Sequence, residues 1–143
     1  MRQNQKGFTL IELLAVIVIL AVIALIATPI ILNVVSDARK KAAADSAYST
    51  IKAVELAFSK ALTTENPPTS LYVQFSTSDT KGYIIKEKSS DSSQLTGITV
   101  DISGTKPTAG SITIDSNGNV TVGTLTINGY SCAKSSGDKI TCS

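Results

Sequence analysis

The chain has 143 residues, the usual size of one domain, and its hydrophobic residues (43%) are mostly aliphatic because aromatic residues make up only 5%. It contains no histidine, no tryptophan and only two cysteines, which excludes imidazole acid–base catalysis, Ser-His-Asp triads and Cys/His zinc sites. The formal charge of +2 is too small for the basic surface of a nucleic-acid binder. We therefore expect no enzyme, no metal or other cofactor, and no binding of nucleic acid by a single chain.

An uninterrupted apolar run begins near the N-terminus. Residues Leu13–Ser36 contain no charged side chain and would form a helix of about 36 Å, enough to cross a bilayer. The run is longer than the apolar part of a secretory signal peptide, about 7–15 residues, although Arg2 and Lys6 precede it. A plain membrane anchor leaves Glu12 unexplained, because an acidic residue at mid-membrane costs roughly 2.5–3.5 kcal/mol and usually has a partner.

The residues around Glu12 carry a family resemblance. Lys6–Glu12 reads KGFTLIE, follows a short basic leader and precedes the apolar run, and it resembles the class III signal of type IV pilins and pseudopilins. The resemblance implies that a membrane peptidase removes residues 1–7 by cutting after Gly7 and methylates the new N-terminal residue, Phe8. It also implies that the α-amino group of Phe8 pairs with Glu12 of a neighbouring subunit, and that an assembly platform and ATPase build the fibre.

The proposed pairing has a simple electrostatic basis. An α-amino group is cationic at neutral pH and stays cationic when singly methylated. A carboxylate in an apolar helix bundle without its cation carries several kcal/mol of desolvation penalty. Only an axial offset that brings Phe8 and Glu12 together is then tolerated, so Glu12 sets the register of assembly, and an uncleaved leader would block it.

The sequence predicts that the helix continues well beyond the membrane and ends at about Leu62. Residues 36–62 are rich in alanine and free of glycine and proline, and breakers arrive at Pro67 and Pro68. We expect Pro29 to kink the helix, residues 8–35 to protrude, and residues 36–143 to form a globular head. The predicted buried face of the second half of the helix consists of Ala47, Ile51, Val54, Phe58 and Leu62.

After the prolines the sequence changes to short runs rich in Val, Ile, Thr and Tyr, which indicate strands. Ser116-Asn117-Gly118 supplies the Asn-Gly dipeptide of a tight hairpin. The expected fold is α+β, with the second half of a long N-terminal helix packed on an antiparallel β-sheet, which is also the pilin architecture. The predicted strands are Leu71–Phe75, Tyr83–Lys86, Ile98–Ser103, Ser111–Asp115, Asn119–Val122 and Thr124–Asn128.

The only two cysteines, Cys132 and Cys142, lie close together at the end of the chain. An even number of cysteines outside the cytoplasm favours a disulfide, and a C-terminal disulfide loop is common in pilins. Two reduced thiols, or a metal pair that lacks further ligands, remain alternatives.

Topology and function follow from the resemblance. Basic residues flank both ends of the apolar run, with Arg39, Lys40 and Lys41 on the far side, so charge counting alone would place the far side, and not the leader, in the cytoplasm. The resemblance places the leader there, because it implies a peptidase that acts at the cytoplasmic face. We expect a single-pass membrane protein that becomes a subunit of an extracellular type IV pilus for adhesion, motility or colonisation. The alternatives are a pseudopilin of a type II secretion or DNA-uptake machine and a monomeric membrane-anchored binding module.

Overall fold

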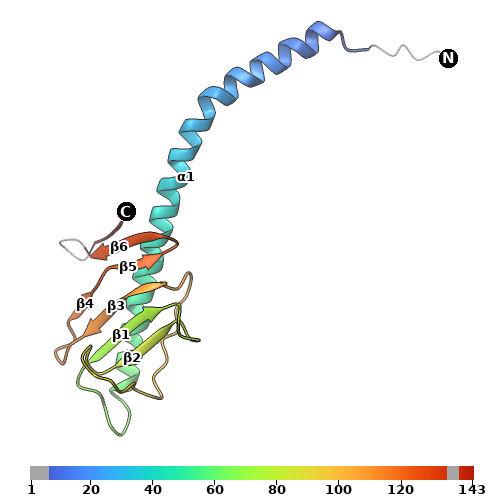
Figure 1. Cartoon of the computed structure of the whole chain (residues 1–143). Coiled ribbons are helices and arrows are strands. Elements are labelled where there is room, and N and C mark those ends of the chain that lie inside the picture. The colour runs from blue at the N-terminus through green and yellow to red at the C-terminus, as the bar shows by residue number, and fades with distance from the viewer. Residues whose placement is uncertain (1–6, 135–138) are drawn as a thin grey trace. The chain divides into compact units, whose positions relative to one another are not determined.

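A computed structural model describes residues 7–134 and 139–143 (Figure 1). The described residues form one long helix, α1, and seven β-strands in a single sheet. The chain divides into two compact units, one that ends at Ala38 and one that comprises residues 39–143. The helix contributes its first part to the first unit and its second part to the other.

Helix α1 extends over Leu10–Ala61. Its sequence explains its length, because the interior holds no glycine and many good helix formers such as alanine and leucine. The helix ends where predicted to within one residue: the Leu62 N–H still donates to the Phe58 carbonyl at 3.0 Å, whereas Thr63 N–H donates to the Lys60 carbonyl in a tighter final turn. Pro67 and Pro68 then keep the chain from continuing as a helix.

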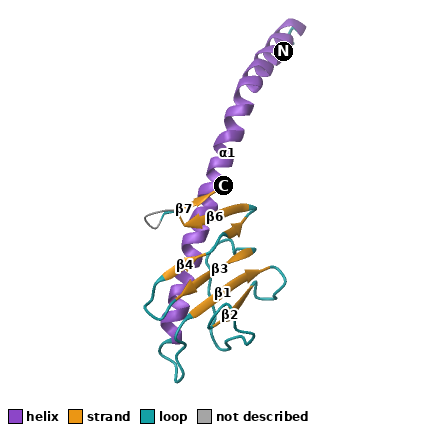
Figure 2. Ribbon diagram, turned by 60° about the vertical axis from the view of Figure 1, so that its left-hand side comes forward, coloured by secondary structure: helices purple, strands orange, loops and turns teal. Residues whose placement is uncertain are grey.

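The sheet is antiparallel throughout and has the order β2-β1-β3-β5-β6-β7, with β4 also paired to β3 (Figures 1 and 2). The α+β class and the packing of a long helix on an antiparallel sheet are therefore confirmed. The strands are β1 (Leu71–Ser76), β2 (Tyr83–Lys86), β3 (Ala109–Ile114), β4 (Val120–Val122), β5 (Leu125–Ile127), β6 (Tyr130–Lys134) and β7 (Ile140–Cys142).

The core lies between the second part of α1 and one face of the sheet. Alternate residues of the strands point inward, as in Leu71, Val73 and Phe75 of β1. The helix contributes small residues, which let it approach the sheet closely. The fully or nearly fully buried helix residues are Ala43, Ala47, Thr50, Val54, Ala57, Phe58 and Ala61.

The predicted helix face was partly wrong. Ala47, Val54 and Phe58 are buried and Ile51 is half-buried, but Leu62 is 50% exposed because it lies just beyond the last helical residue. The core instead follows Ala57 and Ala61 to the end of the helix. Alanine alone gives a weak periodic signal, so the larger Leu62 appeared to continue the face.

The strand predicted at Ile98–Ser103 was also wrong. This segment has no place in the sheet, yet Val100 is buried and its N–H donates to the hydroxyl of Tyr83 at 3.0 Å. The Ser103 carbonyl accepts a hydrogen bond from the hydroxyl of Ser49 at 2.7 Å. Side chains therefore satisfy backbone groups that a neighbouring strand would otherwise pair, and an alternating apolar pattern does not distinguish the two arrangements.

Strand β3 changes partner along its length. Ile112–Ile114 pair with β4, whereas Ala109 pairs with Thr126 of β5. The change takes place at Gly110, which has a φ of 112° and lies so close to β5 that a Cβ atom would collide with the Thr124 carbonyl oxygen and with Leu125. Glycine is thus required at the point where the partner of β3 changes from β4 to β5.

Candidate processing and assembly site

The start of α1 is closed by a reciprocal capping box. The Thr9 N–H donates to Glu12 Oε2 at 2.8 Å, and the Thr9 hydroxyl donates to the same oxygen at 2.7 Å. The Glu12 N–H lies 3.4 Å from Thr9 Oγ1 and 3.1 Å from the Thr9 carbonyl oxygen. Thr9 is therefore the N-cap and Glu12 the third helical residue, an arrangement that satisfies N–H groups left free at a helix start.

Glu12 keeps part of its hydrogen-bonding capacity in this arrangement. Both bonds from Thr9 reach Oε2, and no described residue donates to Oε1. Glu12 is exposed, and a negative charge in the first helical turn is favourable because the helix dipole is positive there. The carboxylate is thus held in place by its own chain while one oxygen stays open to an additional donor.

The predicted cleavage position lies just ahead of the cap. Gly7 and Phe8 precede the first helical residue, Phe8 is 85% exposed, and no atom lies within 4 Å of the position of a Cβ on Gly7. The Gly7–Phe8 peptide bond is therefore sterically accessible within the described part of the chain. Residues 1–6 of the predicted leader lie outside the described residues.

The first part of α1 exposes nearly all of its large apolar side chains. From Leu10 to Leu32 every one is at least 53% exposed. By length and composition α1 is long and apolar enough to cross a membrane. An exposed apolar surface of this extent requires lipid or other helices around it. The exposed side chains are Phe8, Leu10, Ile11, Leu13, Leu14, Val16, Ile17, Val18, Ile19, Leu20, Val22, Ile23, Leu25, Ile26, Ile30, Ile31, Leu32, Val34 and Val35.

Helix α1 continues through Pro29, which has no N–H to donate to the carbonyl of Leu25. One residue earlier the Thr28 hydroxyl donates to the Ala24 carbonyl at 2.6 Å. Such bonds from Thr to the preceding turn often accompany a bend in a helix. The kink at Pro29 itself stays a prediction.

Cys132 and Cys142 form a disulfide that joins the last two strands. The two residues are direct partners in the β6–β7 pairing, and Cys132 is also opposite Leu125 of β5. Strand β7 has a second attachment, because the Ile140 N–H donates to the hydroxyl of Tyr48 on α1 at 2.8 Å. The C-terminal strand is therefore attached both to the sheet and to the helix.

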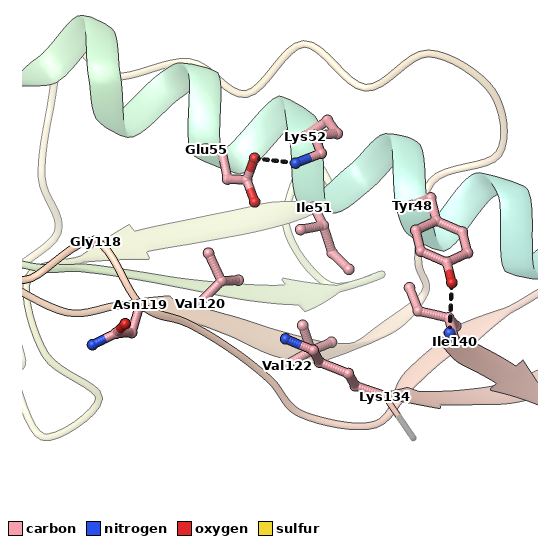
Figure 3. Close-up of a pocket in the computed structure, with 10 residues that line it drawn as sticks. All are labelled: Tyr48, Ile51, Lys52, Glu55, Gly118, Asn119, Val120, Val122, Lys134 and Ile140. Atoms are coloured by element: carbon pink, nitrogen blue, oxygen red, sulfur yellow. Dashed lines mark hydrogen bonds and ion pairs between the residues drawn. The ribbon is translucent and has the colours of Figure 1, made fainter. Parts of the chain in front are cut away.

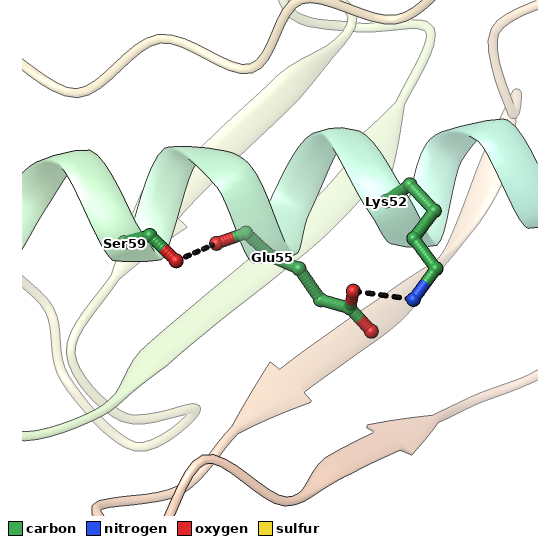
Figure 4. Close-up of polar contacts among 3 residues, drawn as sticks. All are labelled: Lys52, Glu55 and Ser59. Atoms are coloured by element: carbon green, nitrogen blue, oxygen red, sulfur yellow. Dashed lines mark hydrogen bonds and ion pairs between the residues drawn. The ribbon is translucent and has the colours of Figure 1, made fainter.

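A hollow of about 510 Å³ opens between α1 and the sheet near β4 and β7 (Figure 3). Tyr48 and Ile51 line it from the helix, and Val120 and Ile140 from the sheet. The ion pair between Lys52 and Glu55, 2.7 Å long, lies at its rim (Figures 3 and 4). The Glu55 carbonyl accepts a bond from the Ser59 hydroxyl at 2.9 Å (Figure 4). In residues 7–134 and 139–143 no group of three or more His, Cys, Asp or Glu side chains could hold a metal ion.

The structure brings Gly7, Phe8 and Glu12 to the same helix start, but Pro29 and the two cysteines are remote from it along the chain. Thr9 was not among the predicted site residues. The spacing Thr-x-x-Glu immediately before an apolar run is itself a signal for a capping box, and it was available in the sequence.

Comparison with known families finds one match at the N-terminus. Residues 2–28 match the model of the prokaryotic N-terminal methylation motif. Neither the comparison with curated proteins nor that with solved structures finds a match. The motif supports a type IV pilin-like protein, and such proteins are generally structural rather than enzymatic.

Proposed function

We propose that the chain, which carries the N-terminal methylation motif, is the precursor of a structural subunit of a type IV pilus. Residues 1–7 are the leader, residues 8–35 enter the core of the fibre, and residues 36–143 form the head. The observation that carries the proposal is the exposed helix start, where an accessible Gly7–Phe8 bond lies next to the capped Glu12.

Cleavage after Gly7 would convert the Phe8 nitrogen from a peptide N–H into a cationic amine. Methylation of Phe8 leaves that charge in place. The amine is a donor that fits the open oxygen of Glu12 on another copy of the chain, since Thr9 occupies only Oε2. The cap therefore presents the carboxylate in a fixed position, and the new amine supplies its counterion in the apolar fibre core.

The exposed apolar side chains of α1 would be covered in two successive environments. Before assembly they face lipid, which makes the subunit a single-pass membrane protein with its leader in the cytoplasm. In the filament they face the same helix of other copies. The transfer between these environments requires a prepilin peptidase and methylase, a membrane platform and an assembly ATPase as partners. We propose no enzymatic activity for the subunit.

The decisive experiment separates the charge of Glu12 from its capping role. Glu12→Gln removes the charge but keeps a side chain that caps with Thr9, whereas Thr9→Ala removes the hydroxyl cap and keeps the charge. We expect Glu12→Gln chains to be processed and to stay in the membrane without forming filaments. Thr9→Ala chains should still form filaments, because loss of the cap costs only about 0.5–2 kcal/mol of helix stability.

Electron microscopy of material sheared from cells shows whether each variant forms filaments, and the mass of membrane-bound chains shows whether the leader has been removed. Normal filaments from Glu12→Gln would refute the pairing, and loss of filaments in Thr9→Ala alone would assign assembly to the cap. Pseudopilins carry the same motif, so wild-type cells with processed chains but no long filaments would favour a secretion or DNA-uptake pseudopilin. Unassembled chains that keep their leader in the membrane would indicate an anchored binding module.

A further inference from the structure

Three consecutive cations have no role in the proposed assembly. Arg39 and Lys41 are exposed and Lys40 is half-buried. Within the described residues none of them forms an ion pair, since the ion pair found there joins Lys52 to Glu55. Asp37 offsets only one of the three charges. Their side of the apolar run is the one on which the positive-inside rule disfavours basic residues, and a nearby negative charge would offset them.

The position of the cations along α1 indicates where that charge lies. Arg39 follows Val35, the last large residue of the apolar run, by four residues on the same helix, or about 6 Å along its axis. The polar headgroup layer of a bilayer is about 5–8 Å thick on each side. Side chains on a helix also lean toward its N-terminus, which is the direction of the apolar run. The three cationic groups therefore lie within reach of lipid phosphates.

A hollow beside Arg39 supplies further donors. It has a volume of about 300 Å³ and is lined by Arg39, Ala42, Asn128 and Tyr130. Asn128 and Gly129 form the tight turn between β5 and β6, with φ angles of 52° and 82°. This turn places an amide and a phenol next to a guanidinium, and all three groups donate hydrogen bonds to phosphate oxygens. An arginine fork is well suited to bind such oxygens in pairs.

We propose that, before assembly, Arg39 together with Asn128 and Tyr130 binds the phosphate of an anionic phospholipid headgroup, while Lys40 and Lys41 attract the surrounding anionic lipids. The proposal rests on the proposed storage of the subunit in the membrane. Bound phosphates offset the charge on this side of the span. They also add a contact that must break whenever a subunit leaves the lipid for the filament.

The test uses the full chain in nanodiscs of phosphatidylcholine with a rising fraction of phosphatidylglycerol. Native mass spectrometry counts the phosphatidylglycerol molecules that the released chain retains. Each cation near an anionic surface is expected to strengthen binding about fivefold, so Arg39→Gln should weaken retention about fivefold and the triple change of Arg39, Lys40 and Lys41 to Gln up to about 100-fold. Asn128→Gly combined with Tyr130→Phe removes the other donors and preserves the turn, because glycine adopts a positive φ readily.

The matched control removes the same charge elsewhere in the head through Lys81→Gln, Lys86→Gln and Lys88→Gln. The proposal predicts that the control retains phosphatidylglycerol like the wild type. It is overturned if the control loses lipid as the triple variant does, if the triple variant retains lipid normally, or if inorganic phosphate alone binds with the same dependence on Arg39. A wild-type chain that fails to enter nanodiscs would overturn membrane storage, and the present proposal with it. An inserted chain without lipid preference would overturn only the present proposal.

Discussion

Removal of the Cys132–Cys142 disulfide should lower the stability of the head by about 3 kcal/mol. The two cysteines are ten residues apart, so the bond closes a loop of about 11 residues. The loss of loop-closure entropy in the unfolded chain is then about 9 cal/mol/K, or about 3 kcal/mol at 25 °C. For a domain slightly above 100 residues this corresponds to a fall in the melting temperature of roughly 10–20 °C.

The structure also indicates which part of the head should loosen first. Strand β7 has three residues, forms an edge of the sheet and, among the described strands, pairs with β6 alone. Without the disulfide its attachment depends on that short ladder, on the buried side chain of Ile140 and on the bond from Ile140 N–H to the Tyr48 hydroxyl. We expect hydrogen exchange to rise at Ile140 and its neighbours before the rest of the sheet unfolds.

The assay is thermal unfolding of the full chain in detergent micelles, followed by circular dichroism. Double replacement of Cys132 and Cys142 by Ala, which adds no polar group at the buried Cys132, should give a shift similar to that from treatment of the wild type with a reductant, and the reductant should leave the double variant unchanged. A reduced wild type that melts within about 2 °C of the oxidised protein would contradict this prediction, because the sheet would then hold β7 without the covalent bond.

Three further predictions concern the head. Phe58→Ala should destabilise the head by about 3–5 kcal/mol because Phe58 is buried in the core. The half-exposed Leu62 is its control, since Leu62→Ala should change the free energy of unfolding by less than about 0.5 kcal/mol. Urea unfolding measures both variants. Glu87 accepts hydrogen bonds from the hydroxyl and N–H of Thr69 at 2.6 Å and 3.0 Å, which lower the pKa of its carboxyl below the usual 4.5. The ionised Glu87 therefore contributes its full share to the free energy of unfolding above the pKa that it has in the unfolded chain, and this share is lost as the pH falls through the lower pKa of the folded chain. Glu87→Gln should thus make the free energy of unfolding depend less on pH at the acid end. An unaltered pH dependence would contradict this. Gly110→Ala should prevent the pairing of β3 with β5, because a Cβ atom there would collide with β5. Nuclear magnetic resonance would detect this as loss of cross-strand contacts between Ala109 and Thr126. The control Gly118→Ala, in an open turn with positive φ, should keep these contacts.

Much of the fold was predictable because its elements have strong local signals. The helix has an unbroken run of helix formers and ends before a pair of prolines, so its C-terminal end was placed within one residue. Strands β1 and β2 follow from alternating Val, Ile and Tyr residues, and the turn at Asn117-Gly118 joins β3 to β4 as predicted. In each case a short stretch of sequence determines the backbone without help from distant residues.

Strands β6 and β7 were not predicted, because each is short and the second has only three residues. A local signal did exist for β6: Asn128-Gly129 is a typical dipeptide of a two-residue hairpin, and both residues have positive φ. For β7 the pairing depends on the disulfide and on Tyr48, which lies 92 residues earlier in the chain. Contacts over such separations leave no periodic pattern in the strand itself.

The candidate site was predictable in part. The motif Lys6–Glu12 identified the residues for processing, and the N-terminal methylation model matches the same stretch. The role of Thr9 was not predicted, because the expected partner of Glu12 belongs to another subunit and not to the preceding turn of the same chain. The short hydrogen bonds between the two residues show that an ionisable side chain can have an internal partner and still keep one oxygen open.

The mass of the intact mature chain tests the central proposal most directly. Chains isolated from filaments at the cell surface should have lost the mass of Met1–Gly7 and gained that of one methyl group, and fragmentation should place the methyl group on Phe8. Filament-borne chains that retain Met1–Gly7, or that begin at Phe8 without a methyl group, would contradict the account.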